Sequence, residues 1–242
     1  YAGWIEYPEA DLRVCTAPGW QAFPQSVQDG AGGVIIVWAD SRAGSNLYAQ
    51  RVSADGTPQW TSNGVPVCTA FGSQYPFTIV SNGAGGVIVS WQDSRGSSGN
   101  DIYAQRISPA GAVQWAANGV ALCMATGEQL NPTMVSDSSG GAVVAWQDQR
   151  SSDGDIYAQH VSAAGVAEWT TNGVPICTAS GMQLDAAITS DGVGGAIVAW
   201  DDRRNGLVVY AQRVSAAGAV QWAANGVPLH TTAQGSLENP AL

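Results

Sequence analysis

The sequence predicts an all-β protein, a β-propeller built from four-stranded antiparallel blades, and three observations carry this prediction. Four series of residues recur along the chain with a shared period of about 54 residues. Glycine-rich turns separate short apolar segments within each repeat, which is typical of β-hairpins. No segment shows the 3.6-residue periodicity of an amphipathic helix. Four-stranded units of about this length, repeated in tandem, are typical of propeller blades.

The repeat is defined by two tryptophan series, a Tyr-Ala-Gln series and a cysteine series. Their members are Trp38, Trp91, Trp146 and Trp200; Trp60, Trp115, Trp169 and Trp222; Tyr48, Tyr103, Tyr157 and Tyr210; and Cys15, Cys68, Cys123 and Cys177, with His230 at the fifth cysteine position. We therefore divide the single repeat domain, 1–242, into a partial N-terminal repeat at 1–23, full repeats at 24–76, 77–131, 132–185 and 186–230, and a partial terminal strand at 231–242.

Each repeat reads as four strands in order. The first precedes a glycine-rich turn, and the second is apolar on both faces, as expected for a strand with protein on either side. The third carries Tyr-Ala-Gln, and the fourth runs from the second tryptophan to the cysteine. The first strands are expected at Gln25–Val27, Phe77–Val80, Pro132–Val135 and Ala186–Thr189, and the second strands at Val34–Asp40, Val87–Asp93, Ala142–Asp148 and Ala196–Asp202.

The terminal segments do not fit a four-bladed ring. Four blades are the best count, yet an extra strand at about Trp4–Cys15 and a stub at Asn239–Leu242 have no slot in such a ring. The extra strand could lie outside the ring, the chain could come from a longer array, or the ends could pair with neighbouring chains. A β-solenoid is the second choice of fold.

One stretch carries a family resemblance. Pro132 to Trp169 contains Gly-Gly, Trp-Gln-Asp-Gln-Arg and Asp-Ile-Tyr-Ala-Gln, and Ser53 to Trp60 looks like a degenerate Asp box. These motifs resemble the blades of sialidase-like propellers of the BNR or Asp-box type, found in secreted bacterial surface proteins. The resemblance spans nearly the whole chain and implies the propeller fold, without assigning an activity.

Composition narrows the classes of partner. Nine arginines and no lysine stand against 19 acidic residues, a formal net charge of −10. A nucleic-acid surface needs a basic patch, so no nucleic-acid partner is expected. No apolar run approaches the roughly 20 residues of a membrane-spanning helix, so membrane insertion is not expected either. The acidic, glycine-rich composition favours a secreted or cell-surface protein.

The Trp-x-Asp-x-Arg motif recurs once per repeat and is the first candidate binding set. Alternation along a strand puts its three side chains on one face. They could bind sugars, the indole stacking on a pyranose and the Asp–Arg pair bonding hydroxyls, or they could join neighbouring blades. The structural interpretation is favoured because the motif is present in every repeat. Its copies are Trp38, Asp40 and Arg42; Trp91, Asp93 and Arg95; Trp146, Asp148 and Arg150; and Trp200, Asp202 and Arg204.

The loops that follow the fourth strand of each repeat are the second candidate. They are expected at Thr16–Phe23, Thr69–Tyr75, Met124–Asn131 and Thr178–Asp185. Between a recurrent glycine and a recurrent glutamine, one position in each loop differs from copy to copy. A unique ligand would be recognised there, so Trp20, Glu128 and Met182 are candidate binding residues.

No metal or cofactor site is expected. Equivalent cysteines in successive blades should lie too far apart for disulfides, so four buried free thiols are predicted. The chain has two histidines and no close cysteine pair.

These observations together predict a non-catalytic extracellular interaction or structural module. It would bind a glycan or surface protein, or assemble with itself through its terminal strands. Two alternatives stay open: a multivalent carbohydrate-binding lectin and a glycoside hydrolase. The hydrolase is the less favoured, because no pair of acidic residues stands out as a glycosidase site.

Overall fold

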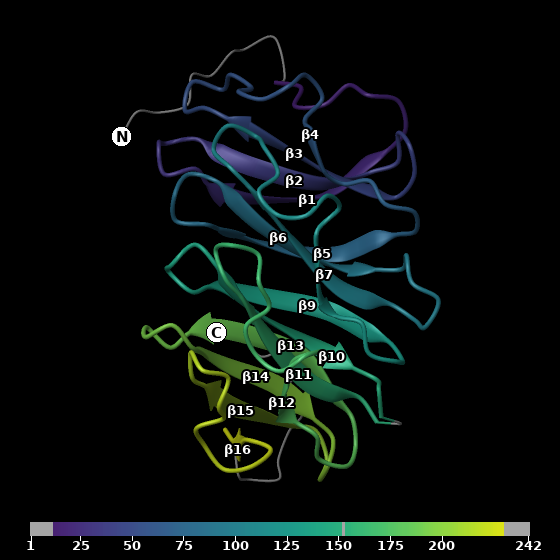
Figure 1. Cartoon of the computed structure of the whole chain (residues 1–242), viewed down its shortest axis with the longest axis vertical. Helices are drawn as coiled ribbons and strands as arrows, with labels where there is room; N and C mark the ends of the chain where they lie inside the picture. The colour runs from purple at the N-terminus through teal and green to yellow at the C-terminus, as the bar shows by residue number, and fades with distance from the viewer. Residues whose placement is uncertain (1–11, 152, 230–242) are drawn as a thin grey trace.

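The computed structural model describes residues 12–151 and 153–229, which form four antiparallel four-stranded sheets (Figure 1). The predicted all-β blade architecture is confirmed. Blade 1 contains β1 (Gln21–Gln28), β2 (Val34–Asp40), β3 (Asn46–Val52) and β4 (Val65–Cys68); blade 2 contains β5 (Gln74–Ser81), β6 (Val87–Asp93), β7 (Asp101–Ile107) and β8 (Val120–Cys123); blade 3 contains β9 (Gln129–Ser136), β10 (Ala142–Asp148), β11 (Asp155–Val161) and β12 (Val174–Cys177); blade 4 contains β13 (Gln183–Ser190), β14 (Ala196–Asp202), β15 (Val208–Val214) and β16 (Val227–Pro228).

The first strand of each blade is longer than predicted, and the last is shorter. Each first strand begins at a glutamine, three or four residues earlier than expected, and a β-bulge interrupts its pairing with the second strand. The residues before the bulge, such as Gln21 and Ala22, had been assigned to loops. The last strand begins well after the second tryptophan, because that indole packs on the next blade instead of joining the sheet.

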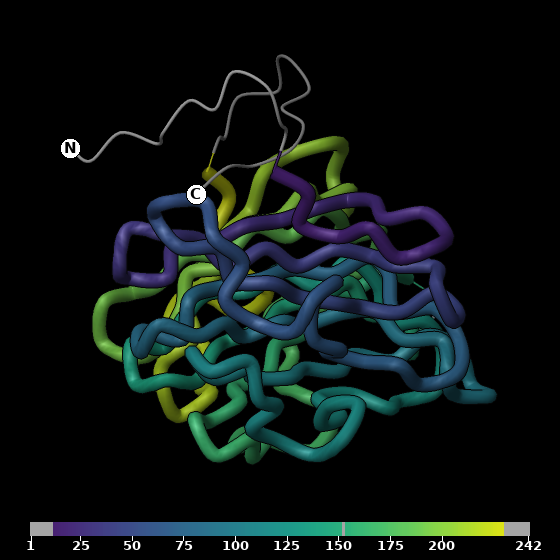
Figure 2. Tube along the Cα trace, turned by 90° about the horizontal axis from the view of Figure 1, so that it is seen from above, coloured from purple at the N-terminus to yellow at the C-terminus, as the bar shows by residue number. Residues whose placement is uncertain are grey.

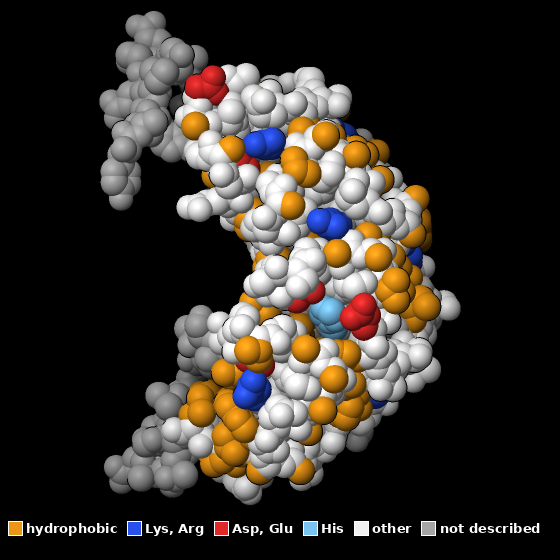
Figure 3. All heavy atoms as spheres, turned by 60° about the vertical axis from the view of Figure 1, so that its left-hand side comes forward, with side chains coloured by type: hydrophobic (Ala, Val, Ile, Leu, Met, Phe, Trp, Pro, Cys, Tyr) orange, Lys and Arg blue, Asp and Glu red, His pale blue; other side chains and the backbone are white. Residues whose placement is uncertain are grey.

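The blades follow one another around an open arc. The first strands of successive blades, β1, β5, β9 and β13, pack against one another in turn, so they lie on the inner side of the arc. Figure 2 views the stacked sheets from above, and Figure 3 shows the resulting crescent, hollowed on one side. The described residues thus form four blades without a closed ring between the first and the fourth. The predicted strand at Trp4–Cys15 lies mostly outside the described residues, and the stub at Asn239–Leu242 lies wholly outside them.

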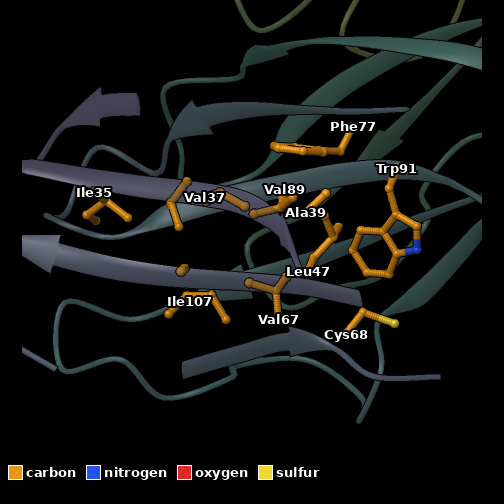
Figure 4. Packing of buried hydrophobic residues seen from close by; sticks show 12 residues of the cluster. Ile35, Val37, Ala39, Leu47, Val67, Cys68, Phe77, Val89, Trp91 and Ile107 are labelled. Carbon is orange, nitrogen blue, oxygen red and sulfur yellow. The ribbon is translucent and has the colours of Figure 1, made fainter. Parts of the chain in front are cut away.

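The hydrophobic core lies between the blades. The back face of blade 1 supplies Ile35, Val37 and Leu47, which meet Val89 and Trp91 from the front face of blade 2 (Figure 4). The same arrangement recurs between blades 2 and 3 and between blades 3 and 4. This explains why the second strands are apolar on both faces, since each is covered on one side by the preceding blade and on the other by the next.

Among the described residues, no helix is long and apolar enough to cross a membrane.

Candidate functional site

The Trp-x-Asp-x-Arg motif forms one hydrogen-bonded cluster in every blade. In blade 4 the indole Nε1 of Trp200 donates to Asp202 Oδ2 at 2.9 Å. The Arg204 guanidinium binds the same carboxylate with two nitrogens, Nε to Oδ1 at 2.8 Å and Nη2 to Oδ2 at 2.6 Å, and lies 4.1 Å from the centre of the Tyr210 ring. Such two-pronged Arg–carboxylate pairs combine strong bonds with fixed geometry.

The arginine also links one blade to the next. Arg204 Nη2 donates to the Asn225 carbonyl at 2.8 Å and lies 3.0 Å from Cys177 Sγ, which belongs to blade 3. Equivalent contacts tie Arg95 to Cys68 and Arg150 to Cys123. The repeated motif therefore holds neighbouring blades together.

The tryptophans of this cluster are too deeply buried for a sugar ring to stack on them. The four indoles, those of Trp38, Trp91, Trp146 and Trp200, are 0–4% exposed. Burial raises the pKa of Asp40, but hydrogen bonds from Arg42 and Trp38 outweigh it and hold the pKa of that carboxyl below its usual value. A sugar ring could reach the indoles only by separating the blades, so the stacking interpretation of these tryptophans is not compatible with the observed packing.

A second buried carboxyl lies beside this cluster in blades 2 and 3. Asp101 and Asp155 begin the third strands and pair in register with Asp93 and Asp148. Burial raises the pKa of both carboxyls, and the nearby charges of Asp93 and Asp148 raise it further. Blade 1 has the neutral Asn46 at this position, so the charge is not required by the fold.

The four cysteines are free thiols. Burial raises the pKa of Cys123 and of Cys177 to about 11. These two thiols are therefore protonated at neutral pH and unsuited to nucleophilic chemistry. Among the described residues, no group of three or more His, Cys, Asp or Glu side chains could hold a metal ion.

The predicted binding positions in the loops are held by their backbone. Trp20, Glu128 and Met182 each use the main-chain carbonyl to accept a hydrogen bond from the loop between the second and third strands of the same blade. The side chain at this position is therefore free to vary without disturbing the fold. Trp20 and Met182 are exposed, whereas the Glu128 carboxylate accepts hydrogen bonds from the backbone and side chain of Asn100 in blade 2. Glu128 joins two loops, and Trp20 and Met182 face solvent.

Two exposed aromatic rings contact each other shortly after Trp20 in the chain. Phe23 lies in β1 and Tyr75 in β5, and their ring centres are 4.5 Å apart. The exposed fractions of Trp20, Phe23 and Tyr75 are 50%, 53% and 40%. We call these three residues the aromatic rim; they lie at the starts of the inner strands of blades 1 and 2. Isolated exposed apolar residues are ordinary, but grouped aromatic rings on one surface mark a binding site.

The backbone at the aromatic rim is strained. Phe23 has a φ of 54°, and Asn131 and Asp185, at the same place in β9 and β13, have a φ of 51°. A bulky residue rarely adopts this left-handed conformation. The conformation recurs at the β-bulge of three blades, so it belongs to the repeat.

Sequence reasoning missed Phe23 and Tyr75, because it assigned both to loops and compared the copies only between the recurrent glycine and glutamine. The signal lay one or two residues after the recurrent glutamine. Aromatic residues occur there in blades 1 and 2, whereas blades 3 and 4 have Asn131 and Asp185 in that short segment.

No family model matches the chain, and no curated protein matches its sequence. Solved structures do resemble it. One is described as an exo-β-1,3-galactanase from Bifidobacterium bifidum (10% identity, TM-score 0.49), with 84% of this chain aligned to 71% of that one. An endo-1,4-β-xylanase from Bacteroides thetaiotaomicron has 7% identity and a TM-score of 0.44, with coverages of 89% and 80%. An α-L-arabinofuranosidase from Fusarium graminearum has 9% identity and a TM-score of 0.47, with coverages of 86% and 68%.

The comparison contradicts one prediction. The chain was predicted to be a non-catalytic interaction or structural module, whereas the three structures named above are described as enzymes that cleave glycosides. At 7–10% identity the likeness extends to the fold alone, and no catalytic residue is transferred by it. The resemblance to sialidase-like propellers stays a prediction, as does the extracellular location.

Proposed function

We propose that this protein binds carbohydrate at the aromatic rim. The observation that carries the proposal is the contact between Phe23 and Tyr75 on the inner strands of two neighbouring blades, with Trp20 just before the first of these strands; each of the three residues is at least 40% exposed. Flat aromatic faces bind the C–H faces of sugar rings, while the Tyr75 hydroxyl supplies a polar group for the sugar hydroxyls.

Both parts of the rim are held in place by the fold. The backbone of Trp20 is fixed on both sides, its N–H donating to Ser41 Oγ at 2.8 Å and its carbonyl accepting from Ser41 N at 3.0 Å. Phe23 and Tyr75 lie in paired strands and contact each other. A surface held in this way loses little conformational entropy when a ligand binds.

The charge of the protein selects among sugars. The chain carries a formal net charge of −10, and Asp185 is exposed at the position that Phe23 occupies in blade 1. An acidic protein repels anionic ligands over roughly 10 Å at 0.1 M ionic strength. We therefore expect neutral oligosaccharides to bind more tightly than uronic-acid or sialylated ones.

A glycan array tests the proposal. The wild-type protein is compared with Trp20→Ala, Tyr75→Ala and a control, Val193→Ala, whose exposed side chain lies in the turn between β13 and β14. Each rim variant should lose about tenfold in affinity for the neutral glycans that bind, as expected for about 1.4 kcal/mol. The control should bind like the wild type.

Two results would contradict the proposal: binding of no glycan at all, or binding that survives in both rim variants. Release of reducing sugar from the bound glycans is measured in the same samples, with Asp185→Asn as the variant of the exposed acid at the equivalent position in blade 4. Turnover that this variant abolishes would extend the proposal from binding to hydrolysis.

A further inference from the structure

Successive blades share one interface with a fixed set of contacts. The second tryptophan of each blade donates its indole N–H to a carbonyl in the next blade: Trp60 to Pro109 at 3.0 Å, Trp115 to Ala163 at 3.0 Å and Trp169 to Ala216 at 2.9 Å. The ring lies over a glycine of the same turn. A Cβ added at Gly111 would come within 2.8 Å of the Trp60 ring, so only glycine fits there.

Blade 4 presents the donating half of this interface with its apolar groups partly uncovered. Trp222 is 38% exposed, against 8% for Trp115 and 9% for Trp169, and among the described residues no carbonyl accepts from its indole. Ile197 is half-buried, although its counterparts Ile35, Ile88 and Val143 are fully buried. Figure 3 shows hydrophobic side chains gathered at the lower end of the crescent, over this blade.

Blade 1 presents the accepting half of this interface, and its apolar groups are also partly uncovered. Val34 and Ile36 are half-buried, whereas the residues equivalent to Ile36 in the other blades, Val89, Val144 and Val198, are fully buried. Gly56 is the counterpart of Gly111 and has no indole over it; a Cβ there would meet only the Leu12 side chain, at 3.7 Å.

We propose that the back face of blade 4 docks on the front face of blade 1 of a second copy of this chain. The contact would repeat, between copies, the apolar and tryptophan contacts that already join the blades within one copy. Trp222 would then take the place of the Leu12 side chain at Gly56 of the second copy and donate to the Ala54 carbonyl. Continuity with three existing interfaces identifies the partner, because each half carries the residue types that its complement needs. This inference goes beyond the proposed carbohydrate binding and does not depend on it.

The docking uses blade faces and not strand pairing by the chain ends. On blade 1, part of the accepting set is already filled from within the chain, since Arg42 Nη2 lies 3.1 Å from Cys15 Sγ and Asn63 Oδ1 accepts from Thr16 N at 2.7 Å. What is left partly uncovered is the apolar surface of Val34 and Ile36, while the half-exposed Leu12 side chain lies at Gly56, where the other interfaces have an indole. The two faces are different, so the contact is heterologous and gives rings or open chains of copies.

Light scattering after size exclusion tests the proposal through a pair of complementary variants. Ile36→Asp places a charge on the accepting face, and Ile197→Asp places one on the donating face. Wild-type protein should show a mass that rises with concentration above 24.9 kDa. Each variant alone should stay monomeric, because a carboxylate must then be buried at the contact. An equimolar mixture should form heterodimers, since one intact face of each kind remains.

The wild-type protein and the single variants distinguish this docking from other modes of association. A wild-type protein that stays monomeric at all concentrations would overturn it. Association of Ile36→Asp alone would overturn it too, since that result means that blade 4 pairs with itself. Circular dichroism melts check that the variants are folded. Trp115→Ala is the control for interface damage within one copy; it should lower the melting temperature and leave the association unchanged. Glycan binding is measured separately at the aromatic rim, so either proposal can fail alone.

Discussion

Replacing Arg204 by alanine should destabilise the protein strongly, because it leaves a buried carboxylate without its partner. The Asp202 side chain is fully buried and Arg204 is 16% exposed. The substitution removes two hydrogen bonds to Asp202, one to the Asn225 carbonyl, and the contact with the Tyr210 ring. The Trp200 indole, the backbone N–H of residue 204 and the weakly donating Cys177 thiol would still bind the carboxylate.

The expected loss is about 3.5–4 kcal/mol, the sum of two contributions. Breaking a buried ion pair by removing one partner costs about 3–5 kcal/mol. We take the lower end, because the guanidinium is partly exposed and water can reach Asp202 once the side chain is gone. The lost cation–π contact with Tyr210 adds about 0.5–1 kcal/mol.

The neighbouring residue provides a matched control. Arg203 is exposed, whereas Arg204 is mostly buried in the cluster, and Arg203→Ala removes the same charge from the same segment. Exposed positions of this kind change stability by about 0.5 kcal/mol or less. Urea unfolding followed by circular dichroism measures both variants, with Arg204→Lys as a third. Lysine keeps the charge but cannot bind the carboxylate with two prongs, so it should fall between them.

A difference of less than about 1 kcal/mol between the two alanine variants would refute the reasoning, since exposed ion pairs have that value. It would mean that water already solvates Asp202 in the folded protein.

Three further predictions follow from the buried groups. Asp101→Asn should stabilise the protein by about 1 kcal/mol at pH 7, because it removes a charge that burial disfavours. The pKa of Asp101 is raised, so the carboxylate destabilises the protein only as the pH rises through that pKa, and the stabilisation by asparagine should vanish in acid. Urea titrations at pH 3 and pH 7 measure this difference. Gly165→Ala should cost at least 1 kcal/mol, because the added Cβ would lie 2.5 Å from the Trp115 ring and the φ of +80° disfavours a side chain, which a melting curve of the variant measures. Cys123 and Cys177 should resist iodoacetamide at pH 7.5 and react in urea, since burial raises the pKa of each to about 11; mass spectrometry counts the adducts, and rapid labelling of the folded protein would show that these thiols are open to solvent.

The blades could be predicted because the repeat supplies four independent copies of the same evidence. Glycine turns set the hairpins, and the apolar second strands indicated packing on both faces. The structural role favoured for Trp200, Asp202 and Arg204 follows from the same argument, since a motif present in every blade serves what all the blades share.

The aromatic rim could not be predicted in this way. Phe23 and Tyr75 lie in strand segments whose pairing passes through a β-bulge, and a bulge depends on the register with the second strand. Their proximity depends on the packing of β1 on β5, which no local pattern encodes. The open arc likewise depends on the angle between blades, and that angle is set by packing along whole interfaces.

Hydrogen exchange measured with and without neutral oligosaccharides tests the central claim most directly. Protein is incubated with the neutral glycans that bind on the array, and backbone protection is located by mass spectrometry. Carbohydrate binding at the aromatic rim predicts added protection in segments 16–23 and 69–77 and no change in the turns at the opposite ends of the strands. Unchanged exchange throughout the chain, or protection confined to other segments, would contradict it.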